Sequence, residues 1–230
     1  MTAQTALIVG AGPGLSAALA RLLAREGFQV ALAARNTAKL SDLVNESGAR
    51  AYACDVSQAP DVTRLFEQVD ADLGAPDLVV FNAGGRYRGP FEELDPAKVH
   101  ETYMVGTFGG FLVAQAAAKR MLERGSGSIF FTGATASVKS LPQSTPFAMS
   151  KFALRALAQG LARELAPKNI HVAHFIIDGG IAGTGAGRAP DESDKWLDPG
   201  AIAENYLHLH RQHRSAWTWE VELRPWVERF

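Results

Sequence analysis

Short apolar runs alternate with stretches of helical periodicity along most of the chain. The first run, Thr5 to Gly10, has the length of a buried strand and ends in a glycine-rich turn. Between residues 15 and 23, leucine and alanine then recur at three- and four-residue steps, which predicts a helix with one apolar face. The chain therefore opens with a strand, a tight turn and an amphipathic helix.

Five further apolar runs have the length and composition of buried strands. They are Phe28–Arg35, Ala49–Val56, Asp77–Asn82, Ser128–Gly133 and His171–Ile177. Helical patterns lie between them, from about Thr37, over 62–69, from about Pro96 to Arg124, and from Thr145 to about Ala166. In the last of these, Thr145 and Pro146 have the residue types of an N-cap and a first helical residue. The alternation predicts βαβ units and a parallel sheet with helices on both faces.

The C-terminal part of the chain has a looser pattern. The stretch of about 179–200 is rich in glycine and charge and predicts a mobile cover over a site. Within it, Asp198 and Pro199 predict the start of a short helix. The segment 217–223 alternates strictly, with tryptophan, valine and leucine on one side, and predicts a half-buried strand.

Composition indicates one α/β domain, placed at 1–230, because 230 residues with 47% hydrophobic residues are typical of that class. The net charge of −1 does not indicate the excess of positive charge that typically binds nucleic acid or an anionic membrane surface. No apolar stretch approaches the ~20 residues that a bilayer span requires, and no basic and apolar leader precedes the first strand. We expect a cytoplasmic protein whose partner is a small-molecule substrate.

Cysteine and histidine provide no pattern of metal ligands. The single cysteine, Cys54, has no partner for a disulfide or a thiolate site, and we expect a buried residue at a strand end. His208, His210 and His213 are spaced so that a helix would point them to different sides, and we expect them to be solvated. His100, His171 and His174 are scattered. The sequence therefore predicts no metal site.

The first turn has the composition of a phosphate-binding loop. Gly10, Gly12 and Gly14 let the backbone turn sharply and approach a phosphate closely, and the following helix directs its free N–H groups at the anion. The spacing is not G-x-G-x-x-G, since Leu15 occupies the third glycine position, but Gly10-x-x-x-Gly14-x-Ser16. A plain structural turn of an α/β connection is the alternative interpretation.

Three motifs in order resemble the short-chain dehydrogenase/reductase family over nearly the whole chain. They are the Gly10-x-x-x-Gly14 turn, Asn82-Ala83-Gly84 after the fourth strand, and Lys151 four residues after an aromatic residue. The resemblance implies a single-domain Rossmann-type, doubly wound parallel sheet of about seven strands with helices on both faces. It also implies a nicotinamide cofactor and a homodimer or homotetramer built on the two long central helices.

The resemblance also implies which residues contact the cofactor. The glycine turn would lie along the pyrophosphate, the end of the third strand beside the adenine, and the end of the fourth strand under the adenine-side ribose. Lys151 would hold the nicotinamide ribose, and Ile181 would meet the carboxamide through its backbone. The full implied set is Gly10, Gly12, Gly14, Leu15, Ser16, Arg35, Asp55, Val56, Asn82, Ala83, Gly84, Lys151, Gly179 and Ile181.

The end of the second strand bears on the choice of cofactor. NAD-selective members of the family place an acid there, whereas this chain has Ala34 followed by Arg35. Without a carboxylate to repel it and with a guanidinium nearby, a 2′-phosphate is favoured, so we expect NADP in preference to NAD. The alternative is that Arg35 is only a solvated charge at a helix start.

Three of the four catalytic positions that the resemblance implies are changed. In the family a tyrosine protonates the substrate carbonyl and a lysine one turn later lowers the pKa of that phenol; here the two positions are Phe147 and Lys151. Ala134 occupies the position of the serine that binds the carbonyl, and Tyr103 that of an asparagine in a water relay. The usual proton donor is therefore missing.

Other groups could supply the proton. Tyr103 carries a phenol on the helix beside the lysine, although a packed helix residue is the simpler interpretation. Lys151 could serve if it is desolvated. Thr132 and Thr135 could hydrogen-bond a carbonyl but are too weakly acidic to donate a proton unaided. Asp178 stands where the family usually has proline, and it either faces the nicotinamide or stabilises a turn.

Two functions follow from these residues. The first is an NADP(H)-dependent oxidoreductase acting on a carbonyl, an alcohol or an activated double bond with an incomplete catalytic tetrad. The second is a catalytically inactive cofactor-binding protein that serves as a sensor or an assembly subunit. The substrate pocket is expected between 85–90, 137–144 and the segment after Gly179, without a decisive charge, and Met149 and Trp196 could add apolar walls.

Overall fold

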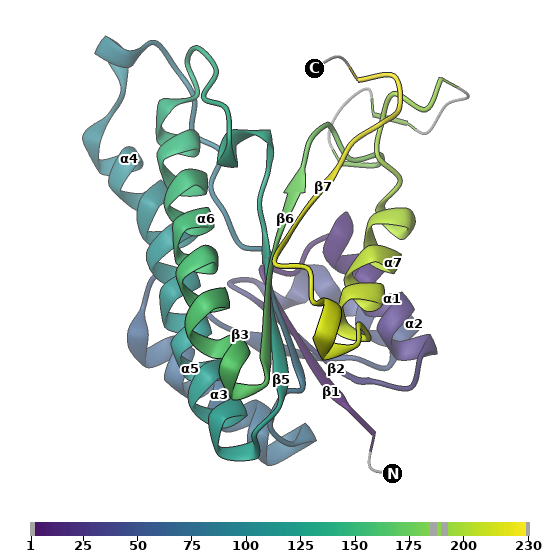
Figure 1. Ribbon diagram of the computed structural model, residues 1–230. Coiled ribbons are helices and arrows are strands. Elements are labelled where there is room, and N and C mark those ends of the chain that lie inside the picture. The colour runs from purple at the N-terminus through teal and green to yellow at the C-terminus, as the bar shows by residue number, and fades with distance from the viewer. Residues whose placement is uncertain (1–2, 185–187, 190–192, 229–230) are drawn as a thin grey trace.

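The computed structural model describes residues 3–184, 188–189 and 193–228, and its centre is one parallel sheet of seven strands (Figure 1). The strands are β1 Thr5–Val9, β2 Gln29–Ala34, β3 Arg50–Ala53, β4 Leu78–Phe81, β5 Gly127–Thr132, β6 Ile170–Ile177 and β7 Glu220–Leu223. Their order across the sheet is β3-β2-β1-β4-β5-β6-β7, and every neighbouring pair is parallel. The order reverses between β1 and β4, which is where doubly wound sheets bind ligands.

Helices cover both faces of the sheet, as the alternating pattern predicts (Figure 1). One layer holds α1 Leu15–Arg25, α2 Ser41–Ser47 and α7 Pro199–His210; the other holds α3 Ala59–Leu73, α4 Pro96–Tyr103, α5 Gly109–Arg124 and α6 Thr145–Leu165. Along β1, Ala6 and Ile8 belong to one apolar core while Leu7 and Val9 belong to the other. A strand covered on both faces must be apolar throughout, which explains the continuous hydrophobic runs. The predicted doubly wound α/β fold is confirmed.

The bounds or regularity of three predicted elements differ in the structure. The N-cap of α6 is Ser144, and Thr145 is already helical. The predicted helix from Pro96 to Arg124 is continuous but contains a π-helical turn, Met104–Phe108, between α4 and α5. The predicted strand over 217–223 is shorter: β7 begins at Glu220, preceded by one backbone hydrogen bond from His174 to Trp219, and the Trp217 ring stacks on His171 with centroids 4.7 Å apart.

Two other sequence features are located in the structure. Asp198 is the N-cap of α7, and its side chain accepts a hydrogen bond from the backbone N–H of Ala201 at 2.8 Å. Cys54 is buried, and burial raises the pKa of its thiol to about 11, so it is a poor nucleophile at neutral pH. Among the residues described, no helix is long and apolar enough to cross a membrane, and no three potential ligand side chains gather as a metal site.

The expectation that the three C-terminal histidines are solvated is wrong for one of them. His208 and His213 are exposed, but His210 is partly buried, with Nδ1 2.9 Å from Ser128 Oγ and its ring edge-on to Phe28. Burial lowers the pKa of His210 to about 4. His174, inside β6, is also buried and has its pKa lowered to about 4, again chiefly by burial.

The lowered pKa values of these two histidines predict a loss of stability in mild acid. Their folded-state pKa values lie below the ordinary value of 6.5, so each contributes stability above pH 6.5 that is lost as the pH falls through about 4. A full shift of this size corresponds to about 3 kcal/mol for each ring. Urea unfolding at pH 7 and at pH 4.5 measures the loss. His210→Gln is expected to reduce it, whereas the same change at exposed His213 should not; equal effects of the two substitutions would contradict the prediction.

Candidate active site

The glycine turn after β1 is pressed against the end of β4. Gly10 has a φ of +87°, and a Cβ at this position would lie 2.5 Å from Cα of Ala83, closer than side chains approach backbone. Ser16 Oγ donates to the carbonyl of Gly10 at 3.1 Å and accepts from Asn82 Nδ2 at 2.7 Å. Only glycine fits at position 10, and the hydroxyl of Ser16 joins the two strand ends at the point where the sheet order reverses.

A cavity of about 210 Å³ opens beside this turn. Seven of the residues that line it belong to the cofactor-binding set that the resemblance implied, and five do not. Its lining is Gly10, Ala11, Ala33, Ala34, Arg35, Cys54, Asp55, Val56, Asn82, Ala83, Gly84 and Val105. The unpredicted residues are small or apolar. Three of them, Ala33, Ala34 and Cys54, lie at the ends of β2 and β3, so extending the prediction to every residue at those strand ends would have included them.

The other implied cofactor residues lie around this cavity but not in its wall. Leu15 and Ser16 are buried in the first turn of α1, whereas Gly12 has open space beside it. Gly14 contacts the methyl group of Thr184, so the segment after β6 reaches the glycine turn. Sequence reasoning missed Thr184, and no local pattern marks it. The roles of these residues in cofactor binding stay predictions.

Arg35 is the cationic residue of the first cavity, and it is accessible. Its side chain is 69% exposed and lies 3.9 Å from an oxygen of Glu101, which is itself 67% exposed. Such an exposed pair contributes little, so the guanidinium can exchange it for a stronger anion. Ala34 beside it provides no carboxylate, and Asp55 already accepts hydrogen bonds from the backbone N–H and hydroxyl of Ser57.

Lys151 is buried on α6 between the ends of β4 and β5. Its Nζ donates to the carbonyl of Thr132 at 2.7 Å, and a Cβ placed on Gly84 would lie 3.7 Å from it. The same Nζ lies 5.9 Å from the centroid of the Phe147 ring. Burial lowers the pKa of Lys151 to about 8, so its ammonium group can lose a proton near physiological pH.

A second cavity, of about 190 Å³, contains the ring of Phe147. All three segments expected to form the substrate pocket contribute to it. Its lining is Arg86, Arg88, Ala134, Thr135, Ala136, Lys139, Leu141, Ser144, Phe147, Ile177, Gly179, Gly180 and Arg188. The expectation that this pocket lacks a decisive charge is wrong, because folding brings together cationic residues from three separate segments.

Tyr103 and Met149 do not lie in either of these cavities. They face a separate apolar groove of about 410 Å³ between α4 and the start of α6, and Tyr103 is 43% exposed. Its neighbour Thr102 is the buried residue, and it packs against Gly85 instead. The structure therefore does not bring the phenol of Tyr103 to the second cavity, and Met149 is no wall of it.

Three further candidate groups are already engaged. Thr132 Oγ1 lies 2.8 Å from the hydroxyl of Tyr206, inside the core. Thr135 donates its hydroxyl proton to Asp178 at 2.6 Å, and the other oxygen of that carboxylate accepts from Arg224 at 2.6 Å. Asp178 therefore joins the loop after β5 to the end of β7. This favours the interpretation in which Asp178 stabilises a turn. In this arrangement neither threonine hydroxyl is free to bind a carbonyl.

A buried polar chain that the sequence did not suggest supports Ala134. Ser137 Oγ accepts from the backbone N–H of Ala134 at 3.1 Å and lies 3.3 Å from Nε2 of His174. Nδ1 of His174 lies 3.1 Å from Glu220, which also accepts two hydrogen bonds from Arg155. The serine and histidine are fully buried, so the arrangement holds the loop after β5 in place rather than presenting a nucleophile.

The predicted mobile cover, about 179–200, lies only partly within the described residues. Ile181 forms a bridge with Leu197, and the Trp196 ring packs over Gly180, with the Arg188 guanidinium 5.4 Å from its centroid. These described parts are therefore tied to the end of β6. Residues 185–187 and 190–192 lie outside the described ranges, and the mobility of the segment stays a prediction.

Comparison with known proteins agrees with this arrangement. The family model described as short chain dehydrogenase matches residues 4–192. An uncharacterized oxidoreductase from Staphylococcus aureus strain N315 is 30% identical over 229 residues, which is 98% of each chain. A crystal structure of a short-chain dehydrogenase from Rhodopseudomonas palustris has a TM-score of 0.85 and 37% identity, covering 97% of this chain and 99% of that one.

A further solved structure bears on the cofactor. An alcohol dehydrogenase from the archaeon Thermococcus sibiricus, solved as a complex with 5-hydroxy-NADP, has a TM-score of 0.86 and 28% identity over 98% of both chains. With a seven-stranded parallel sheet and a family match that covers most of its length, the chain belongs to the short-chain dehydrogenase family of NAD(P)-binding oxidoreductases.

Proposed function

We propose that the protein is an NADP(H)-dependent oxidoreductase in which Lys151, rather than a tyrosine, holds the proton that the reaction requires. The observation that carries the proposal is the position of Lys151. Its buried Nζ lies between Gly84 of the first cavity and Phe147 of the second. The reaction class is hydride transfer to or from a carbonyl, an alcohol or an activated double bond.

The first cavity suits the adenosine end of a dinucleotide. At Gly10 the backbone leaves no space for a Cβ, the neighbouring walls are small residues, and Arg35 in the wall would supply a cation for a 2′-phosphate. When bound, the nicotinamide would supply or accept the hydride. The hydrogen bond between Asn82 and Ser16 would fix the turn that receives the pyrophosphate. Lys151 would bind the nicotinamide ribose and would carry, on Nζ, the proton that the reaction requires.

Lys151 can hold a proton at a suitable pKa, whereas Phe147 cannot hold one at all. An ammonium group with a pKa of about 8 is partly deprotonated near neutral pH, which is the range where a general acid works best. Water between Nζ and the second cavity would carry the proton to the substrate oxygen, because Lys151 is not in that cavity's wall.

The second candidate function is a cofactor-binding sensor or assembly subunit without turnover. It is favoured by the absence of a hydroxyl at Phe147 and Ala134 and by the engagement of Thr132 and Thr135 elsewhere. Turnover of NADPH with a panel of carbonyl compounds decides between the two. If NADPH binds and no compound accelerates its oxidation, the sensor function replaces the enzyme.

The preference for NADP is tested at Arg35. Arg35→Gln is expected to weaken NADPH binding about tenfold and to leave NADH binding unchanged, because only NADPH carries the phosphate that the guanidinium would meet. Fluorescence titration of both coenzymes measures this. The matched control is Arg25→Gln, at the exposed end of α1. Equal weakening of NADPH and NADH would contradict the preference, and binding of neither below millimolar concentration would remove both proposed functions.

We further propose that the protein forms a homodimer or homotetramer through the outer face of α4, α5 and α6. Large apolar side chains are exposed along this face, among them Phe111, Met149 and Phe152. The ring of Phe111 stacks on Phe108 with centroids 6.0 Å apart. Apolar side chains grouped in this way are typical of surfaces that another chain covers.

A further inference from the structure

Four cationic side chains surround the cavity that contains Phe147. Arg86 and Arg88 come from the loop after β4, Lys139 from the loop after β5 and Arg188 from the segment after β6. The described lining includes no aspartate or glutamate. In a chain with a net charge of −1, four cations around one small cavity produce a strong local positive field.

Among the residues that the structure describes, these cations have no carboxylate partner. The guanidinium of Arg86 lies 5.9 Å from the centroid of the Phe147 ring, and burial together with Arg88 and Arg188 lowers the pKa of Arg86. In the part of the chain that the structure describes, none of the four is within ion-pair distance of an acid. Their mutual repulsion is unfavourable, and an anion between them would relieve it.

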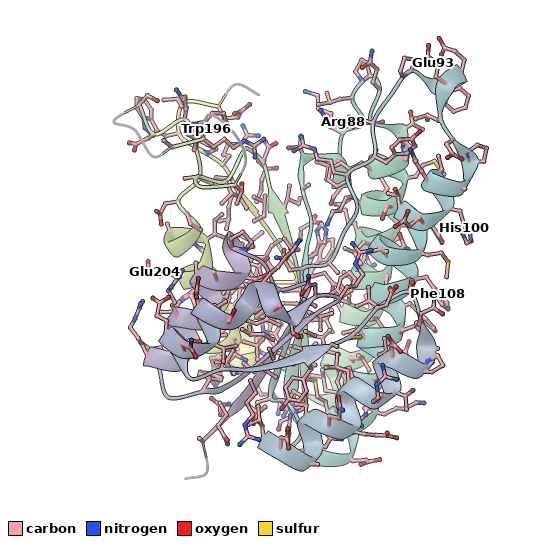
Figure 2. The ribbon with its side chains drawn as sticks, turned by 180° about the vertical axis from the view of Figure 1, so that it is seen from behind. Arg88, Glu93, His100, Phe108, Trp196 and Glu204 are labelled. Carbon is pink, nitrogen blue, oxygen red and sulfur yellow. The ribbon has the colours of Figure 1, made fainter. Side chains whose placement is uncertain are left out.

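The cations also lie on opposite sides of the cavity. Figure 2 shows Arg88 and Trp196 at the same end of the molecule, on loops at either side of the sheet. Arg188 belongs to the Trp196 side, where its guanidinium lies 5.4 Å from the centroid of the indole ring, and its carbonyl accepts from the N–H of Gly183 at 2.7 Å. The cavity is therefore bounded by cations on two sides and by the Phe147 ring.

We propose that this cavity binds a small substrate that carries a carboxylate or phosphate group, held by Arg86, Arg88 and Arg188 while its reacting carbon lies beside Phe147. The inference rests on the proposed function, because it names the substrate class of the same site. Guanidinium groups pair with both anions in a bidentate way. Apolar walls such as Leu141 and Ile177 reduce the screening of that interaction by water.

Matched pairs of carbonyl compounds test the charge requirement. Isothermal titration calorimetry with the NADP⁺-saturated protein, in which the carbonyl cannot be reduced, compares levulinate with methyl levulinate, and dihydroxyacetone phosphate with dihydroxyacetone. In at least one pair the anion is expected to bind tenfold or more tightly than its uncharged partner, and the preferred pair identifies carboxylate or phosphate as the group recognised. Equal affinities within both pairs, or no binding by any of the four compounds, would overturn the proposal.

Substitutions in the cavity test its location. Arg86→Gln and Arg188→Gln are each expected to weaken binding of the preferred anion at least fivefold and to leave the thermal midpoint of unfolding within a few degrees of the parent. The matched control is Arg163→Gln, which removes the same charge from an exposed site on α6. A similar loss in the control, or no loss in the two cavity variants, would overturn the assignment to this cavity.

The two proposals fail in different ways. Titration of NADPH into the same protein samples tests the proposed function separately. If NADPH does not bind but the anion still does, and Arg86→Gln weakens it, the anion site stands and the proposed function fails. If NADPH binds and displaces the anion competitively, the anion occupies the cofactor's phosphate site, and the present inference is overturned while cofactor binding stands.

Discussion

Lys151→Met is expected to abolish NADPH-dependent turnover and to raise the free energy of unfolding at pH 7. Burial lowers the pKa of Lys151 from 10.5 to about 8, a penalty on the ammonium of about 3 kcal/mol. Methionine fills a similar volume without that charge but loses the hydrogen bond to the Thr132 carbonyl, at a cost of about 1–2 kcal/mol. The expected net gain is about 1–2 kcal/mol by urea unfolding, with turnover reduced by a factor of 10² or more.

The pH dependence of the free energy of unfolding is a sharper test of the lowered pKa of Lys151. Between pH 8 and pH 10.5 the unfolded chain binds more protons at Lys151 than the folded protein does, so the parent gains stability as the pH rises through this range. The advantage of Lys151→Met should therefore shrink toward pH 10. Lys168→Met, at an exposed site, should change neither stability nor turnover, and Tyr103→Phe should keep full turnover. Loss of turnover in Tyr103→Phe would return the proton donor to that phenol.

Phe147→Tyr combined with Ala134→Ser is expected to increase the kcat/KM of carbonyl reduction by about 10²-fold or more. The Phe147 ring lies in the second cavity, 5.9 Å from Nζ of Lys151, and Ala134 lines the same cavity. The pair of substitutions adds a proton donor whose pKa the lysine would lower and a hydroxyl that can bind the carbonyl oxygen. Initial rates of NADPH oxidation with the substrate panel measure the gain.

Matched variants separate this gain from a general effect of added hydroxyls. Phe152→Tyr makes the same change on α6 at a side chain that is 43% exposed, outside the cavity, and should leave the rate unchanged. Each single variant in the cavity should gain less than the pair, because the two hydroxyls act on the same oxygen. A double variant that binds NADPH normally but is no faster than its parent would show that Phe147 does not stand in the proton donor's place.

Most of the fold could be predicted because its signals are local. The run ending at Gly10 and the periodicity of α1 each lie within a dozen residues, and both depend on which faces are buried. The errors occurred where a distant contact decided the outcome. Trp217 alternates as a strand residue would, but it lies before β7 and its ring stacks on His171. His210 has a polar side chain at a helix end, but contacts with Phe28 and Ser128 partly cover it.

The sequence predicted which residues belong to the site better than it predicted where their side chains lie. The resemblance to the family placed Tyr103 beside Lys151, but in the structure Tyr103 is 43% exposed, and the buried side chain beside it is that of Thr102, which packs against Gly85. The π turn at 104–108 follows directly. The contact of Thr184 with Gly14 joins segments that are far apart in the chain. Neither feature has a signature in the residues around it.

The sequence by itself determined the order of strands and helices along the chain, the glycine-rich composition of the first turn and the absence of a hydroxyl on Phe147. These are properties of residue type and short-range periodicity, and packing does not alter them. Only the tertiary structure decided that Lys151 is buried enough to lower its pKa, and that Arg86 and Arg188 lie around one cavity. Desolvation and the summed field of charges depend on which segments meet, and the chain brings those segments together only when the sheet has formed.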